Sequence, residues 1–420
     1  MSLILRSERA HKLKHFLTKS HCSIQGFWID YPNIEALLKQ LNISESTIFT
    51  PFTTSSFYSP FGLEATAPVF SNSSLPQLPS PLGQVLATFQ LFERIPIEDR
   101  ASIIGLLYAI IDLDKNEKTF SEYDRMTAHD LFIRMGISKR LVDDFIRPTL
   151  LVGLFKPPEE LSAAVVMELL YYYALAHQSS FDVRWLKRGS IANVFFNPLY
   201  TYLSNNYDFT LMDSTRVDSV NLQPEMGHNS DRLVNELSYS TYKKSSEGSI
   251  GMGQGAGQGV VEKGVLSGLD GVVLALGSKG LKSVMAGSPE LSYTSPQLTK
   301  AASMGSIDCI SCRIWLNKKL RTGSPSNVLS RFDALRGAGG TFFMLDQLHK
   351  DHLSELWGET EVRNSSLIAS GVEERGSVIA VDFYNAGMYM AHIPCMSSIV
   401  FSILYPSCAY ICFLRIYMCI

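Results

Sequence analysis

The stretch 158-PEELSAAVVMELLYYYALAH-177 predicts a long, deeply buried helix at the centre of a helical block. Pro157-Pro158 suits a helix start, because the first helical residue has no use for its N–H group. The residues that follow are apolar on nearly every face, as in a helix surrounded by core. Glu168 interrupts the apolar run, which is too short for a membrane span.

Further helices are predicted on the N-terminal side of this stretch. Pro32 opens a segment in which apolar residues recur at helical spacing. Thr127 followed by Asp130 is related to a capping box, and Ser138 can cap another helix. That last helix should stop before Pro148, because proline cannot donate the hydrogen bond that a helix interior needs.

Strand-forming segments follow the helical block. They are residues 208–212, 216–222, 271–276, 307–316, 341–345 and 377–384. Between them, residues 223–268 are rich in Ser, Asn, Lys and Gly, which predicts a flexible surface insert. The pattern therefore predicts an α/β (mixed α+β) fold in which a helical block is inserted between sheet-forming segments.

Composition excludes several classes of function. The formal net charge of -3 lacks the basic excess that tight nucleic-acid binding requires. Seven cysteines are too few and too unevenly spread for a disulfide framework, which indicates a reducing compartment. Cys309 and Cys312 form a C-x-x-C motif, but on a strand their thiols point to opposite faces. We therefore expect neither a shared metal nor a redox pair there.

Several blocks, in this order along the chain, resemble zeta-carotene desaturase and its desaturase and isomerase relatives, a branch of the FAD-containing amine oxidase superfamily. The blocks are Gly26-Phe27-Trp28 with Tyr31-Pro32-Asn33-Ile34, Tyr58-Ser59-Pro60 with Gly62-Leu63-Glu64, Leu78 to Gly83, Tyr123 to Trp185, Val272 to Gly277, Arg313 to Leu316, and Val381-Asp382-Phe383-Tyr384. The strongest is the long run from Tyr123 to Trp185. Their order along the chain makes coincidence improbable.

The resemblance implies a partial FAD-binding, Rossmann-like domain into which a largely helical substrate domain is inserted. The implied division is 1–25 unassigned, 26–205 mainly helical substrate block, 206–222 with 269–291 part of the FAD-binding sheet, 223–268 flexible insert, 292–390 substrate-domain strands, and 391–420 an atypical apolar tail. The family's N-terminal G-x-G-x-x-G turn is absent from residues 1–25. The one formal match, at 251–256, lacks a preceding strand and a following helix, and we expect it to be a loop.

The implied activity is that of an FAD-dependent oxidoreductase that moves a hydride from an apolar polyene to flavin, or isomerises a double bond. The expected partners are this polyene, a quinone electron acceptor and a membrane surface, in a plastid. No catalytic side chain and no metal are implied. Two alternatives remain: a truncated, non-catalytic product that binds a lipid or a partner, and a membrane-anchored structural protein. The tail can be the product of an unspliced intron or an altered reading frame, a membrane span, or a loosely packed or interfacial segment.

The resemblance also gives site residues. Val217 lies where relatives place a strand that meets the adenine end of FAD, with an ordinary buried valine as the alternative. Ala275 and Gly277 end a predicted strand, and strand ends in such sheets face the ligand crevice. Gly277 can equally be a simple turn residue.

Aromatic residues of the helical block suit the wall of a tunnel for a rigid conjugated chain. These substrate-binding candidates are Phe155, Tyr171, Tyr172, His177 and Trp185. Aromatic residues at helical spacing also occur as plain core. A capped or buried structural role is the alternative for the histidine, which has no carboxylate or second histidine near it in sequence.

Overall fold

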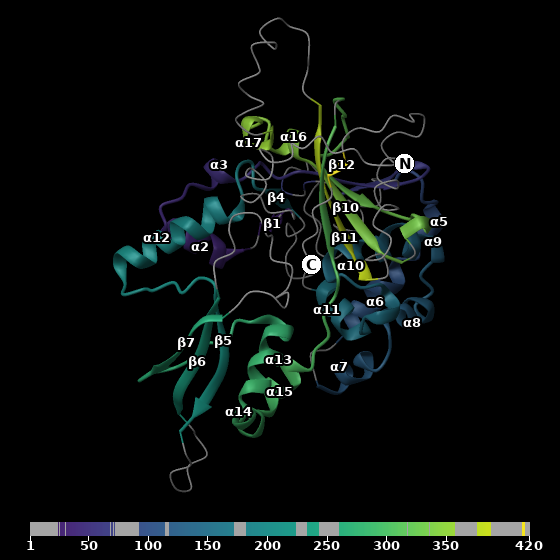
Figure 1. Cartoon of the computed structure of the whole chain (residues 1–420). Coiled ribbons are helices and arrows are strands. Elements are labelled where there is room, and N and C mark those ends of the chain that lie inside the picture. Colours follow the sequence, from purple (N-terminus) through teal and green to yellow (C-terminus); the bar gives the residue numbers. More distant parts are fainter. Residues whose placement is uncertain are drawn as a thin grey trace, which may run out of the picture. The chain divides into compact units, whose positions relative to one another are not determined.

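The computed structural model describes residues 24, 26–29, 31–67, 69, 71, 92–113, 117–171, 182–223, 233–242, 260–316, 318–335, 337–357, 376–387 and 414–415. They form two compact units (Figure 1). Unit 1 runs from Leu203 to Ser306, and unit 2 comprises the described residues up to Tyr202 and from Ile307 onward. Helices and strands are mixed in both units, which confirms the predicted α/β class.

Unit 2 is built on a seven-stranded sheet. Its strands are β2 (Ser55–Ser59), β3 (Gly62–Ala67), β8 (Ile310–Trp315), β9 (Ser326–Leu329), β10 (Gly339–Met344), β11 (Val378–Tyr384) and β12 (Leu414–Arg415). Their order in the sheet is β12-β8-β11-β10-β9-β2-β3, and only β2 and β9 pair in parallel. The central strands β8, β10 and β11 match three of the predicted strands.

Both faces of the central strands are buried, as expected of strands without polar alternation. Alternate side chains of β8, β10 and β11, among them Ile314, Phe342 and Val381, form one apolar cluster. The opposite face carries Phe343 and Ala380 in a second cluster. A small antiparallel pair, β1 (Gly26–Trp28) with β4 (Val183–Trp185), supplies Val183 and Trp185 to this second cluster.

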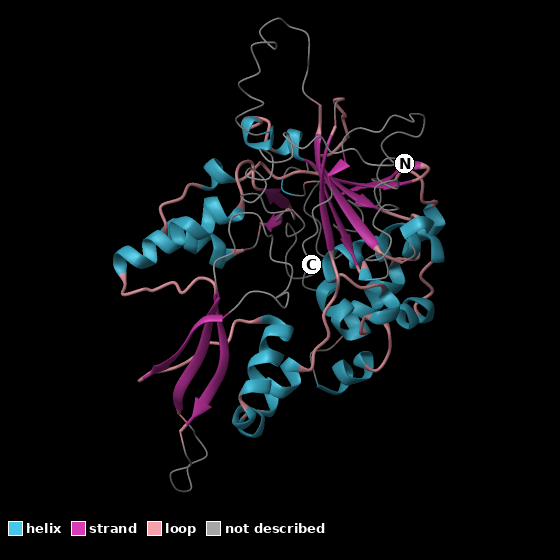
Figure 2. Cartoon of the chain, viewed as in Figure 1, coloured by secondary structure: helices cyan, strands magenta, loops and turns pink. Residues whose placement is uncertain are grey.

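Helices between β3 and β4 surround a third core that contains Leu131, Phe132 and Leu150. These helices, drawn in Figure 2, are α5 (Ile97–Ala101), α6 (Ile104–Asp112), α7 (Glu117–Asp124), α8 (Ala128–Arg134), α9 (Lys139–Leu141), α10 (Arg147–Leu154) and α11 (Ala163–Tyr171), with the 3-10 turn η3 (Pro158–Glu160) before α11. Two further helices, α2 (Pro32–Gln40) and α3 (Glu45–Ile48), contribute Leu38 and Ile48 to a separate core. The other helices are α12 (Asn197–Asn206), α16 (Leu345–Leu348) and α17 (Ser354–Trp357). Both predicted caps are confirmed, since Thr127 accepts from Asp130 N and Ser138 from Leu141 N, each at 3.0 Å. In the described part of the chain, no helix combines the length and apolarity of a membrane span.

The sequence predicts that the helix after Ser138 stops before Pro148, and this prediction is wrong. It widens into a π-helical turn, η2 (Val142–Ile146), and continues as α10. Proline lacks the N–H that would bond the carbonyl four residues earlier, and the wider turn lets the chain stay helical without that bond. A second π-helical turn, η5 (Ala192–Phe196), likewise precedes Asn197-Pro198. Both π-turns thus have the same cause.

The predicted single helix 158–177 is also wrong in its first turns. Pro158–Glu160 form a 3-10 turn, the chain then extends through Ser162, and α11 begins at Ala163. Ser162 forms an isolated bridge with Thr127, so tertiary pairing overrides local helix propensity at this point. Ala163 and Met167 are fully buried, whereas Val165 is exposed.

Unit 1 contains an antiparallel sheet in the order β5 (Thr215–Leu222), β6 (Val234–Tyr242), β7 (Val260–Ser267). The helices are α13 (Gly277–Gly287), α14 (Pro289–Thr294) and α15 (Pro296–Ala302). They share an apolar core with β5 that includes Val220, Val284 and Leu291. Gly287 allows α13 to approach β5, since a Cβ there would lie 2.3 Å from the Asp218 carbonyl oxygen.

Three predictions for the residues of unit 1 are wrong. The predicted flexible insert 223–268 contains β6 and β7, in which Val234, Tyr239, Thr241 and Tyr242 are residues that favour strands. Residues 208–212 and 271–276 form no strand. The sheet expected to be part of a parallel, Rossmann-like arrangement is antiparallel in the described residues.

Candidate functional site

A row of polar side chains crosses the buried face of the central sheet. Asp382 of β11 lies directly between Ser311 of β8 and Thr341 of β10 in the strand register. All three are at least nine-tenths buried. The Ser311 hydroxyl donates to Asp382 Oδ1 at 2.5 Å. A carboxyl group in this place interrupts an otherwise apolar face and costs free energy unless it is hydrogen-bonded.

A phenol and a thiol adjoin this carboxyl group. The Tyr384 hydroxyl lies 3.0 Å from Thr341 Oγ1. Burial, and secondarily the nearby Asp382, raise the pKa of Tyr384 above its ordinary value. The same two causes raise the pKa of the Cys309 thiol. Both groups are therefore protonated near neutral pH, while Cys312 points into the core on the other sheet face, as the alternation predicts.

The C-terminal end of α10 covers this part of the sheet. A Cβ on Gly339 would lie 2.5 Å from Leu151 Cβ, so the missing side chain lets α10 approach β10. Immediately after α10, the Phe155 ring packs on Tyr384 with 4.9 Å between ring centroids. We call Phe155, Cys309, Ser311, Thr341, Asp382 and Tyr384 the Tyr384 cluster.

Two residues of this region have left-handed backbone conformations that bulky side chains rarely adopt. Phe155 caps α10 with φ 60°, at a position where glycine is usual. Asn385, next to Tyr384, has φ 55°. Such conformations persist only where the surrounding structure fixes them, and they concentrate at functional sites. Phe155 is also 39% exposed, which makes it the accessible edge of the cluster.

Trp185 lies over the same face at the other side of the polar row. Its ring centroid is 4.7 Å from that of Phe343, and its Nε1 donates to Thr53 Oγ1 at 2.9 Å. Phe343 is four residues beyond Gly339 on β10, or about 13 Å at the rise of an extended strand. Aromatic pairs thus flank the polar row, although Trp185 itself is core-buried.

The other substrate-binding candidates are not brought to the cluster by what the structure describes. Tyr171 is the last residue of α11, and its side chain lies outside the described part. Tyr172 and His177 lie outside the described residues altogether.

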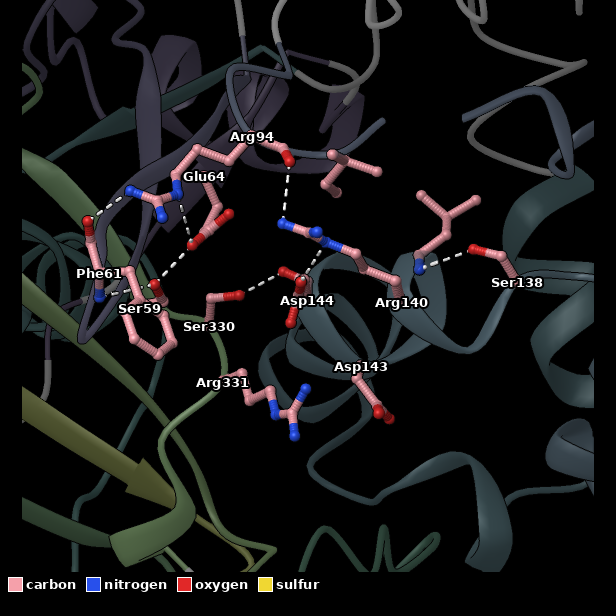
Figure 3. Close-up of polar contacts among 12 residues, drawn as sticks. Ser59, Phe61, Glu64, Arg94, Ser138, Arg140, Asp143, Asp144, Ser330 and Arg331 are labelled. Carbon is pink, nitrogen blue, oxygen red and sulfur yellow. Dashed lines mark hydrogen bonds and ion pairs between the residues drawn. The ribbon is translucent and has the colours of Figure 1, made fainter. Parts of the chain in front are cut away.

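Charged residues fix the start of α10 against the sheet (Figure 3). Glu64 of β3 accepts from Ser59 Oγ at 2.5 Å and lies 3.6 Å from Arg94 Nε. Arg140 donates to the Arg94 carbonyl at 2.9 Å and places its Nε 3.4 Å from Asp144 Oδ2. Ser330, just after β9, donates to the Asp144 carbonyl, whose helical partner would have been the missing N–H of a proline.

The Asp144 carboxyl group, which pairs with Arg140, has a shifted pKa. Burial, then the neighbouring Glu64, raise its pKa, while Arg140 and Arg331 oppose the shift. Among the described residues, Glu64 Oε2 is buried and has no hydrogen-bond partner. These charges anchor the helix that carries Phe155 to the Tyr384 cluster.

The cofactor candidates lie in unit 1. Val217 is a partly buried residue of β5 and contacts the unit 1 core. Ala275 is exposed and belongs to no strand, which corrects the expected strand end. Gly277 has φ 63° and is the first residue of α13. A left-handed glycine therefore stands at the N-terminus of α13.

Comparison with known proteins supports a fold assignment. The sequence matches no protein-family profile and no curated protein. The structure is similar to an oxidoreductase from Methanosarcina mazei, with TM-score 0.51, 10% identity, and coverage of 92% of this chain and 73% of that one. It is also similar to cyclohexylamine oxidase from Brevibacterium oxydans, with TM-score 0.53, 10% identity, and coverage of 94% and 72%. The chain has an amine oxidase fold.

The residues of this amine oxidase fold fit a flavin in part. The turn at Gly277 fits one phosphate group, because a helix N-terminus presents open N–H groups and glycine lets the backbone come close. A parallel strand pair beside that turn is not among the described residues. The described side chains contain no group of three or more His, Cys, Asp or Glu arranged to hold a metal.

The residues at the centre of the site are not among those predicted from sequence. Asp382 and Tyr384 occur in the quoted block Val381–Tyr384, but neither was assigned a role. One signal was available: Asp382 is the only charged residue in the strand Val378–Tyr384, whose other residues are apolar or aromatic. Thr341 and Cys309 gave no such signal, because their roles depend on the register between strands.

Proposed function

We propose that this chain is a flavin-linked oxidoreductase that acts on a long apolar polyene, as carotenoid desaturases and isomerases do. The observation that supports this proposal most strongly is the Tyr384 cluster, a buried polar row flanked by aromatic pairs on the sheet face of an amine oxidase fold. Aromatic rings provide large apolar contact for a conjugated chain at little cost in conformational entropy. A quinone acceptor and a plastid membrane are part of the same proposal.

The chemistry divides between cofactor and protein. When bound, a flavin accepts a hydride from a substrate C–H bond. Phe155 and Tyr384 would hold the apolar chain, and Thr341 would fix the Tyr384 hydroxyl. Tyr384 and Cys309 remain protonated near neutral pH beside the Asp382 carboxyl group. The apolar walls would exclude water from this carboxyl group.

The test is an anaerobic incubation of the purified chain with FAD and a linear polyene in detergent micelles. Desaturation predicts loss of oxidised-flavin absorbance together with a polyene product of extended conjugation, because the hydride gained by the flavin is lost from the substrate. Isomerisation predicts a polyene of altered geometry with no net reduction of the flavin. Phe155→Ala should weaken polyene binding, whereas Phe61→Ala, which removes an aromatic ring that is 76% exposed, should not. A flavin that binds but is never reduced by any polyene, with every polyene recovered unchanged in geometry, would contradict the proposed substrate.

A specific observation favours a second function, that of a non-catalytic lipid- or partner-binding product. The described part of unit 1 holds only antiparallel strands, whereas a dinucleotide site of the Rossmann type is built on parallel ones. Under this alternative, the polyene binds and quenches tryptophan fluorescence, but FAD does not bind. The same incubation therefore separates the two functions.

A further inference from the structure

Gly339, the first residue of β10, is a buried glycine in close contact with α10. Glycine weakens a strand relative to alanine, because it loses more backbone freedom when the chain folds. A Cβ at this position would lie 2.5 Å from Leu151 Cβ and 3.2 Å from both Leu151 Cγ and Cδ1. Side-chain atoms do not approach one another that closely, so any side chain at position 339 would push α10 away from the strand.

This contact lies beside the contact between the Phe155 and Tyr384 rings. Phe155 follows Leu151 by one helical turn, or about 6 Å along the helix axis. Tyr384 is directly opposite Gly339 in the register of β10 and β11. Side chains that are opposite each other in an antiparallel pair share one sheet face, about 5 Å apart. The two spacings match, so α10 meets neighbouring strands through two adjacent contacts.

Leu151 is the side chain through which this turn of α10 contacts β10. It is 3% exposed. Val152 and Leu154 pack against the helical core of unit 2 instead. Gly153 is exposed, and a Cβ there would have no atom within 4 Å. The distance between this end of α10 and the sheet therefore depends on Leu151 and Gly339.

We infer that Gly339 is a positioning residue for the site: by letting Leu151 rest on the strand, it holds the Phe155 ring on Tyr384. The inference takes its substrate, an apolar polyene, from the proposed function. Moving a Cβ from 2.5 Å to the 3.4 Å of ordinary contact would lift α10 by about 1 Å. The ring centroids, now 4.9 Å apart, are near the short end of the favourable range, so such a shift would weaken their contact.

Urea unfolding tests this contact without any substrate. Backbone preference alone would make Gly339→Ala stabilising in the strand and Gly153→Ala stabilising in the helix. Contact with Leu151 reverses the expected sign at position 339 only. The unfolding midpoint should therefore fall for Gly339→Ala and rise for the matched control Gly153→Ala. The fall should be smaller in a Phe155→Ala background, because the ring contact is already absent there.

Binding of a linear polyene in detergent micelles, followed by quenching of tryptophan fluorescence, tests the effect on the site. Gly339→Ala should raise the Kd about two- to tenfold, the range expected when one aromatic contact is weakened or lost. It should have no further effect in the Phe155→Ala background, and Gly153→Ala should bind like the wild type. Leu151→Ala removes the supporting side chain without overcrowding the strand, so it should raise the Kd through Phe155 even where Gly339→Ala does not fold.

Two results would overturn the inference. One is a Gly339→Ala variant that is more stable than the wild type, because the contact with Leu151 would then not limit this position. The other is an equal effect of Gly339→Ala, or of Leu151→Ala, with and without the Phe155 ring. A wild-type chain that binds no polyene would contradict the proposed substrate, whereas the unfolding comparison would still decide whether Gly339 positions Phe155.

Discussion

At the scale of single residues, Phe155 is the most unusual member of the site. A bulky side chain in the left-handed conformation costs roughly 1–2 kcal/mol, and the ring contact with Tyr384 offsets part of this. Phe155→Ala keeps the strain and loses the ring, whereas Phe155→Gly loses both. We predict that the alanine variant is less stable than the glycine variant by about 1 kcal/mol in urea unfolding. Equal stabilities would contradict the strained conformation.

The Thr341 hydroxyl is a residue-scale feature with a separate prediction. Thr341→Val retains shape but leaves the partly buried Tyr384 hydroxyl without its partner in the described structure, which should cost about 1 kcal/mol. In the double variant with Tyr384→Phe, most of this loss should vanish, because both polar groups are gone. Simple additivity of the two single-variant losses in urea unfolding would exclude the predicted pairing.

His349 makes stability depend on pH. Burial, and secondarily Arg313 and His352, lower its pKa from 6.5 to about 4. Between pH 6.5 and about 4, the imidazole binds a proton in the unfolded chain but not in the folded chain. The free energy of unfolding is therefore highest above pH 6.5 and falls as the pH approaches 4. The decrease should be about 3 kcal/mol. It should disappear in His349→Gln and persist in His352→Gln, as measured by unfolding at several pH values.

At the scale of elements, the sequence indicates secondary structure better than pairing. Capping by Thr127 and Ser138 and the three central strands were predictable, because each depends on local residues. The continuation of the helix through Pro148 was not, because the Asp144 carbonyl that proline leaves without an N–H partner is bonded by a serine far along the chain. Residues 271–276 have strand composition but no neighbouring strand in the described part, and composition alone cannot show that.

The π-turn leads to a test of how α10 is anchored. Ser330→Ala removes the donor to the Asp144 carbonyl and should cost about 1–3 kcal/mol. Pro148→Ala restores an N–H that can bond the same carbonyl. We therefore predict that Ser330→Ala costs less in a Pro148→Ala background than in the wild type. Equal costs in a double-mutant cycle would show that the proline is not the cause of the π-turn.

At the scale of the whole molecule, the fold class was predictable. The separation of the strands into a seven-stranded sheet in unit 2 and a three-stranded sheet in unit 1 was not. The amine oxidase fold follows from structural similarity over more than nine-tenths of this chain, at only 10% identity. The Tyr384 cluster combines residues 155, 309, 311, 341, 382 and 384, and the register of three strands brings the last five together. Sequence patterns on single elements could identify Phe155 and could not identify its partners.

The absorption spectrum of the purified chain after incubation with FAD and desalting tests the central claim most directly. The proposed oxidoreductase function predicts a retained flavin spectrum in stoichiometric amount, which Gly277→Val should abolish because its side chain would strain the turn at φ 63°. A folded but colourless protein would contradict a flavin-linked function. The non-catalytic binding function would then be the better account of this chain.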